Sequence, residues 1–192
     1  MPAGGESVSQ FTHVPNILTG YRFIAAPLLL FCLYPGADTW ISLLGFALYL
    51  SAALTDLADG YIARKYQVES VLGKLMDPLA DKVLVAAALV MLIPLGRMPA
   101  WVAFLILSRE LVVTGLRGVA ASSGLVIAAS RLGKWKSMVQ LIALGTLMFP
   151  LGVLPIPYLH QVGHVILYVA LVLTIWSGID YFYRFQKLYL NP

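Results

Sequence analysis

The sequence predicts an all-α, polytopic membrane protein with six transmembrane helices in a single domain that covers residues 1–192. Hydrophobic residues make up 60% of the chain, and the mean hydropathy is +0.84. Only 11% of the residues are charged, against about 25% in soluble proteins. The apolar residues form runs of about 20, the length that a helix needs to cross a bilayer. A soluble fold cannot bury this much apolar surface, so the composition excludes a soluble protein.

The first four predicted spans are bounded by turn residues. Pro35 and Gly36 end the first span, and the segment from Gly96 to Pro99 forms a tight turn between the third and the fourth. A small, polar segment after the fourth span is predicted to be a loop or a surface helix. The four spans are residues 17–34, 40–63, 75–95 and 100–119, and the polar segment is residues 120–131.

The last two spans share one long uncharged stretch. Residues 137–179 contain no Asp, Glu, Lys or Arg, and this stretch is too long for a single crossing. Pro150, Pro155 and Pro157 lie near its middle. Because proline breaks the interior of a helix, these residues are predicted to divide the stretch into a fifth and a sixth span.

The basic residues predict the orientation in the membrane. Lys and Arg favour cytoplasmic connections, and Arg97 alone falls on the side opposite to the others. Both termini are therefore expected to be cytoplasmic. Residues 1–10 hold no Lys or Arg, which argues against a cleavable signal peptide. The basic residues of the predicted cytoplasmic connections are Arg64, Lys65, Lys74, Arg117, Arg131, Lys134, Lys136, Arg184 and Lys187.

Four aspartates stand at the cytoplasmic ends of spans two and three. Asp56 and Asp59 are three residues apart, and Asp77 and Asp81 are four apart, so each pair shares one helix face. Ionisable groups in a membrane are costly and usually functional. Four carboxylates close together need cations, and oxygen-only ligands suit Mg²⁺ or Mn²⁺. Two such ions could clamp a diphosphate. The structural alternative is salt bridges to neighbouring basic residues, namely Arg64, Lys65, Lys74 and Lys82.

The residues around these aspartates resemble the signature of the CDP-alcohol phosphatidyltransferases. The pattern Asp-x2-Asp-Gly-x2-Ala-Arg-x8-Gly-x3-Asp-x3-Asp is matched at every position, by Asp56, Asp59, Gly60, Ala63, Arg64, Gly73, Asp77 and Asp81. The segment from Pro15 to Arg22 is similar to the N-terminal motif of the family, and the six-span layout fits. The resemblance implies an enzyme that joins a CDP-linked lipid or alcohol to a second alcohol and releases CMP.

The resemblance also implies roles for individual residues. Asp56, Asp59, Asp77 and Asp81 would bind the metal ions, and Asp81 would also be the general base. The residues expected to bind CDP-diacylglycerol are Asn16, Thr19, Gly60, Ala63, Arg64, Ser70 and Gly73. Asn16 has an alternative interpretation as a helix N-cap.

A second basic cluster lies outside the signature. Arg109, Arg117, Arg131, Lys134 and Lys136 are expected to bind an acceptor that itself carries phosphate. The segments around them resemble the bacterial branch of the family that uses sn-glycerol 3-phosphate. The alternatives are an ion pair of Arg109 with Glu110 or with the aspartates, or a membrane-surface anchor formed by residues 131, 134 and 136.

The expected partners are therefore CDP-diacylglycerol, sn-glycerol 3-phosphate and the lipid bilayer, with no nucleic acid. The resemblance further implies a homodimer in the bacterial inner membrane, with the active site facing the cytoplasm. Within the family, the acceptor could instead be phosphatidylglycerol, inositol phosphate or serine. An intramembrane Mg²⁺-dependent prenyltransferase and an ion transporter are more remote alternatives, because here the acidic motifs are adjacent and the last two spans are almost wholly apolar.

Overall fold

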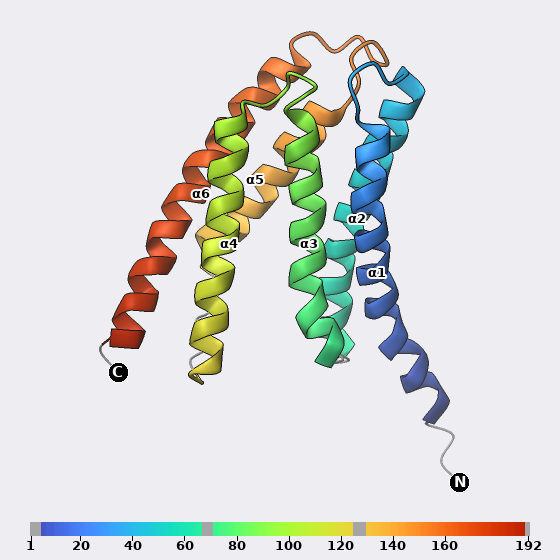
Figure 1. Ribbon diagram of the computed structural model, residues 1–192. Coiled ribbons are helices and arrows are strands. Elements are labelled where there is room, and N and C mark those ends of the chain that lie inside the picture. The colour runs from blue at the N-terminus through green and yellow to red at the C-terminus, as the bar shows by residue number, and fades with distance from the viewer. Residues whose placement is uncertain (1–4, 67–70, 125–129, 191–192) are drawn as a thin grey trace. The chain divides into compact units, whose positions relative to one another are not determined.

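The structure is a computed structural model that describes residues 5–66, 71–124 and 130–190 (Figure 1). Side chains are described except at residues 5–18, 56–66, 71–75, 77–78, 131 and 189–190. Within the described ranges the secondary structure consists of six helices and contains no strand. The helices are α1 (Gly5–Cys32), α2 (Thr39–Tyr66), α3 (Val71–Leu92), α4 (Ala100–Ser122), α5 (Arg131–Met148) and α6 (Leu159–Leu190).

The predicted all-α class is confirmed, and most predicted helix boundaries lie close to the observed ones. The turn at Gly96 is present with φ +67°, and α5 and α6 are separated at the predicted prolines. The clearest differences are in three helices. Helix α1 starts at Gly5, so its first turns precede the apolar run, α5 starts at Arg131, before the uncharged stretch, and α6 continues to Leu190, beyond the end of that stretch at residue 179. Helix α4 continues to Ser122 before Gly124 adopts φ +73°.

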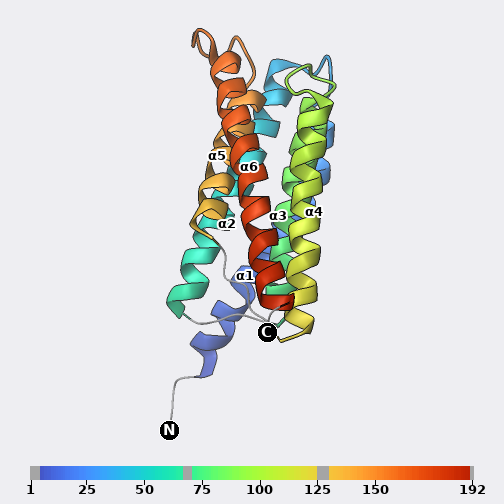
Figure 2. The ribbon, with the colours of Figure 1, turned by 90° about the vertical axis from the view of Figure 1, so that its left-hand side faces the viewer.

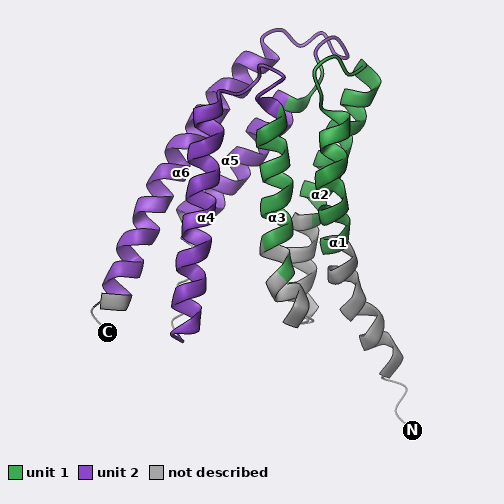
Figure 3. Cartoon of the chain, in the orientation of Figure 1, with its two compact units in different colours: residues 1–91, 148–150 green, residues 92–147, 151–192 purple. Residues whose placement is uncertain are grey.

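The chain divides into two compact units, which Figure 3 shows in separate colours. Unit 1 consists of Met1–Met91 and Met148–Pro150, and unit 2 consists of Leu92–Leu147 and Leu151–Pro192. In unit 1, α2 runs antiparallel to α1 and α3. In unit 2, α4 and α6 run in the same direction and α5 runs in the opposite one, as the two views agree (Figure 1, Figure 2).

Unit 1 is built on close packing of α1 against α2. A Cβ atom on Gly45 would lie 2.9 Å from Cys32 Cβ, so only glycine permits the approach of the two helices there. Further along the same pair, Tyr21 Oη and Ser51 Oγ form a hydrogen bond of 2.6 Å. Phe46 and Phe149 meet edge to face, with ring centroids 5.1 Å apart.

Unit 2 contains the contact between α4 and α6. The rings of Trp101 and Tyr168 lie 6.3 Å apart between these helices. Before α4, Arg97 donates a hydrogen bond of 3.0 Å to the carbonyl of Leu147, in the last turn of α5. Such carbonyls have no partner within their own helix. Burial lowers the pKa of the Arg97 guanidinium. Its hydrogen bond to Leu147 gives the guanidinium a structural role at the end of α5.

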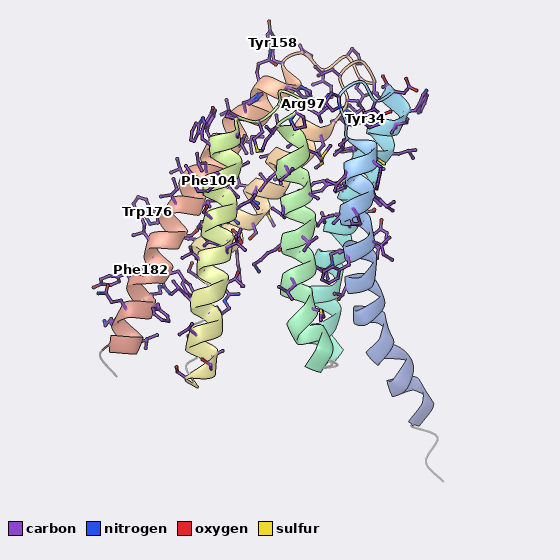
Figure 4. The ribbon with its side chains drawn as sticks, viewed as in Figure 1. Tyr34, Arg97, Phe104, Tyr158, Trp176 and Phe182 are labelled. Carbon is purple, nitrogen blue, oxygen red and sulfur yellow. The ribbon has the colours of Figure 1, made fainter. Side chains whose placement is uncertain are left out.

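Large apolar side chains point away from the helices over much of the surface. Phe104, Tyr158, Trp176 and Phe182 are all more than half exposed (Figure 4). Extensive apolar exposure is typical of a surface that contacts lipid. Among the described residues, the segment Leu159–Leu188 is long and apolar enough to cross a membrane, with a mean hydropathy of 2.0. Six spans with cytoplasmic termini therefore stay a prediction.

Candidate active site

The aspartate motif is divided between two consecutive helices of unit 1. Asp56 and Asp59 belong to α2, whereas Asp77 and Asp81 belong to α3. Only residues 67–70 separate the helices, so the Cα atoms of their facing ends can be at most roughly 18 Å apart. The backbone of both segments is helical, which is the conformation that the spacing argument requires.

Asp81 is the one aspartate of this motif whose side chain is described. It is exposed, and its carboxylate acts electrostatically on the buried phenol of Tyr49 in α2. No group of three or more candidate metal ligands occurs among the described side chains, because the other three carboxylates lie outside them. Several other predicted site residues also lie outside the described side chains, namely Asn16, Gly60, Ala63, Arg64, Ser70, Gly73 and Arg131.

The N-terminal motif lies within α1. The backbone of Asn16 is inside this helix rather than at its start, so the N-cap interpretation is wrong. Thr19 is buried, and Arg22 is fully buried. A buried guanidinium is stable only when other groups compensate for its loss of contact with water. Arg22 does interact with another group of the protein. Sequence reasoning assigned Arg22 to the motif but gave it no role.

In unit 2, Glu110 connects two residues of the predicted acceptor cluster. Its Oε1 atom accepts a hydrogen bond from Arg109 Nη1 at 3.1 Å and a second one from Lys136 Nζ of α5. The Lys136 side chain is only 5% exposed. Arg109 also donates from Nη2 to Ser177 Oγ of α6 at 2.9 Å. Glu110 and Arg109 thus tie α4 to both α5 and α6.

A small residue on α6 makes room for this arrangement. A Cβ atom on Gly178 would lie 3.1 Å from Arg109 Cγ, so the arginine stem fills the space that a larger residue would occupy. Ser177 is held in turn by its own bond to the Thr174 carbonyl at 3.1 Å. The guanidinium therefore has a defined position in the seam between α4 and α6.

Two further basic residues of the cluster have described side chains, and neither takes part in the printed contacts of this network. Arg117 is exposed, and its guanidinium lies over the ring of Tyr181 in α6, 5.9 Å from the centroid. Lys134 is exposed on α5. The structure therefore brings Arg109 and Lys136 together through Glu110, whereas Arg117 and Lys134 are exposed at the surface.

The electrostatics of unit 2 suit an anionic ligand. Two cations and one carboxylate give the group Arg109, Glu110 and Lys136 a net charge of +1, and Arg117 adds a positive charge on the same helix pair. The ion pair between Arg109 and Glu110, which the sequence offered as an alternative role for Arg109, is present. Guanidinium and ammonium groups in a partly neutralised cluster retain further N–H donors, which are the groups that phosphate oxygens accept from.

Sequence reasoning missed the contribution of α6. Thr174, Ser177 and Tyr181 follow one another at intervals of three and four residues within an otherwise apolar run, and Gly178 lies four residues after Thr174, so this spacing places all four near one helix face. All of the non-glycine members of this set are buried. The spacing of small and polar residues was therefore a usable signal, whereas the neighbouring helix could come only from the fold.

Comparison with known proteins accounts for these features together. The sequence profile of the family described as CDP-alcohol phosphatidyltransferase matches residues 12–176. The chain is 37% identical to a CDP-diacylglycerol–glycerol-3-phosphate 3-phosphatidyltransferase of Rickettsia bellii, over 92% of this chain and 97% of the relative. It is 43% identical to the Bacillus subtilis protein of the same name, over 73% and 72% of the two chains.

A third relative, from Mycobacterium tuberculosis, is called a probable phosphatidylglycerophosphate synthase. It is 38% identical over 92% of this chain and 83% of its own length. The family profile extends across the N-terminal motif, the aspartate motif and the α4–α5 region that holds the basic cluster. The chain belongs to the CDP-alcohol phosphatidyltransferase family.

Proposed function

We propose that this enzyme transfers the phosphatidyl group of CDP-diacylglycerol to sn-glycerol 3-phosphate, giving phosphatidylglycerophosphate and CMP. The names of the relatives, at 37–43% identity over most of the chain, support this choice of substrates. The observation that carries it is the cationic group around Glu110, which suits an acceptor with its own phosphate. Phosphatidylglycerol, inositol phosphate and serine are the competing acceptors.

In this proposal the lipid substrate binds unit 1 from the membrane. Its acyl chains stay in the bilayer, while the signature residues of α2 and α3 hold the CDP diphosphate, with Arg64 on the phosphate oxygens. Asp56, Asp59, Asp77 and Asp81 would hold two Mg²⁺ or Mn²⁺ ions, a role that fits their oxygen-only donor set. When bound, these ions supply positive charge that stabilises the transferring phosphate and the departing CMP.

The reaction needs a proton acceptor but no protein nucleophile. The 1-hydroxyl oxygen of glycerol 3-phosphate attacks the phosphorus that bears diacylglycerol, and Asp81 takes the hydroxyl proton. A new P–O bond forms as the bond to CMP breaks. The exposure of Asp81 is compatible with proton release to solvent after each turnover.

The proposal includes a membrane arrangement. Six spans would place both termini and the active site at the cytoplasmic face of a bacterial inner membrane. The apolar exposure of the described helices and the apolar segment Leu159–Leu188 support membrane insertion, and the distribution of Lys and Arg supports the orientation. Family membership further suggests a homodimer, which the mass of the purified protein in detergent would test.

An acceptor screen tests the proposed reaction. Purified protein in detergent would be given labelled CDP-diacylglycerol with each acceptor in turn, and CMP release would be measured with and without excess chelator. Release with glycerol 3-phosphate alone, and its loss with chelator, is the expected result. Release only with phosphatidylglycerol, inositol phosphate or serine would keep the family and replace the acceptor.

A further inference from the structure

Arg22 is a fully buried cation on the packed face of α1. The residue is 0% exposed. Buried residues at intervals of three and four positions along α1 define this face, namely Thr19, Arg22, Ala26 and Leu29. An ionised group in such a setting is costly unless an opposite charge or hydrogen-bond acceptors compensate it. Arg22 does interact with another group of the protein, so the compensating group is part of the polypeptide.

The contact between α1 and α2 shows what lies at the level of Arg22. A Cβ atom on Gly45 would lie 2.9 Å from Cys32 Cβ, so these two residues are level with each other in the antiparallel pair (Figure 1). Arg22 comes ten residues before Cys32, and Thr55 comes ten residues after Gly45. Because both helices rise by about 1.5 Å per residue, Arg22 and Thr55 lie at nearly the same level. The hydrogen bond of 2.6 Å between the side chains of the two helices shows that they remain together in this region.

The aspartate signature is close to this level. Asp56 follows Thr55 directly, and Asp59 is three residues further along α2. Helical side chains lean toward the start of their own helix, so the side chain of Arg22 is expected to lean toward the end of α2 that carries both aspartates. Asp38 precedes the opposite end of α2, about 25 Å from the level of Thr55. The register of the two helices therefore points to the signature as the source of the compensating charge.

We infer that Arg22 is a positioning residue of the aspartate site, a buried counter-ion at the level of Asp56 that offsets the charge of the signature carboxylates before metal ions bind. The inference rests on the proposed function, because it assigns to Arg22 a part of the charge compensation that the ions complete. Carboxylates gathered at one site repel one another. Loss of the guanidinium should therefore destabilise the metal-free protein and strengthen the attraction of the site for a divalent cation.

The test measures the unfolding temperature of the purified protein in detergent, first with excess chelator and then in a titration with Mg²⁺. In chelator, Arg22→Gln should unfold roughly 10 °C below the wild type, the effect of breaking a buried ion pair. Its half-maximal stabilisation should need roughly tenfold less Mg²⁺. Arg22→Lys keeps the charge and should lose less stability. The matched control is Arg97→Gln, which removes a partly buried guanidinium that binds a backbone carbonyl and should cost the same with and without Mg²⁺.

A second substitution tests the pairing without any metal ion. In chelator, adding Asp56→Asn to Arg22→Gln should recover part of the lost stability, whereas adding Asp38→Asn should recover none. If Arg22→Gln does not fold, the amount of folded protein in the membrane gives the same comparison between the two double variants. Equal losses for Arg22→Gln with chelator and with saturating Mg²⁺, or equal behaviour of the two double variants, would overturn the inference. A wild type whose unfolding temperature ignores Mg²⁺ would instead contradict the proposed metal site.

Discussion

At the scale of single residues, Glu110 is the counter-ion of two basic residues of the predicted acceptor cluster, Arg109 and Lys136. Lys136 is too deeply buried to keep its charge in an apolar seam without a counter-ion. The carboxylate of Glu110 supplies that counter-ion and also engages Arg109. Of the described basic residues in the predicted acceptor cluster, Arg117 and Lys134 are the exposed ones. These two are therefore the best residues for a kinetic test.

Asp81 is the residue on which the proposed chemistry can be tested most directly. Asp81→Asn should lower kcat by roughly 10²–10⁴-fold, because the amide cannot accept the hydroxyl proton, while binding of CDP-diacylglycerol stays measurable. Asp56→Ala should also remove turnover, through loss of a metal ligand. Steady-state CMP release and lipid binding would be measured for each variant. Asp38→Asn, an exposed aspartate outside the motif, should behave as wild type. Full activity of the Asp81 variant would refute its role as the base.

Arg117 and Lys134 should recognise the acceptor through charge. Replacing either residue by Gln should mainly raise the KM for glycerol 3-phosphate and lower kcat/KM tenfold to a hundredfold, since a hydrogen bond to a charged group is worth about 1.5–3 kcal/mol. The control is Lys187→Gln, an exposed lysine of α6 outside the cluster. Equal effects at residues 117, 134 and 187 would instead identify a general membrane-surface anchor.

At the scale of elements, α4 is the hub of unit 2. It contacts α6, donates to Ser177 through Arg109 and reaches α5 through Glu110. Helices in a bilayer gain little from apolar contact with one another, so polar links and small residues make their packing specific. Gly178 and the Glu110 network perform these two functions here.

The link between α4 and α5 should be measurable as a coupling energy. Glu110→Gln leaves the Lys136 ammonium without its carboxylate, and loss of one member of a buried pair costs about 3 kcal/mol. Lys136→Met should cost a similar amount, because it leaves Glu110 without its closest partner. The double variant should lose clearly less stability than the sum of the two, as judged by unfolding in detergent. Additivity within about 0.5 kcal/mol would show that the pair does not connect the helices.

At the scale of the whole molecule, the two units divide the proposed tasks. Unit 1 carries the aspartate signature on α2 and α3, and unit 2 carries the basic cluster on α4 and α5. Arg97, the one basic residue predicted on the outer side, binds the carbonyl of Leu147. This hydrogen bond accounts for a basic residue on the outer side. Arg97 therefore does not contradict the orientation that the other basic residues predict.

Site-directed labelling tests this orientation. Single cysteines near residues 37, 97 and 154 should react with an impermeant thiol reagent added outside the cell, whereas cysteines near residues 68 and 133 should not. The native Cys32 should first be replaced, so that each variant carries a single cysteine. Alanine is the suitable replacement because it keeps the Cβ atom that packs where α1 approaches Gly45. Permeabilised cells provide the control, because all five positions should then react. The opposite pattern in intact cells would overturn the cytoplasmic active site.

The sequence by itself determined the helical class, most helix boundaries and the family. These depend on local signals: runs of apolar residues, turn residues such as Gly96, and eight signature residues at set spacings along two helices. The clearest exceptions were the start of α1 and the end of α6. Residues 5–16 lack an apolar run and residues 180–187 include charged side chains, so hydropathy gives little sign of a helix in either segment.

Only the tertiary structure decided which residues share a site in unit 2. Glu110 meets Lys136 across 26 residues, and Arg109 meets Ser177 across 68. Such pairings depend on which helices become neighbours, and hydrophobic periodicity reports only which face of a helix is apolar. The burial of the Tyr181 hydroxyl beside Arg117 depends on the same packing of α4 against α6, because a buried environment is created by the neighbouring helix and not by the local sequence.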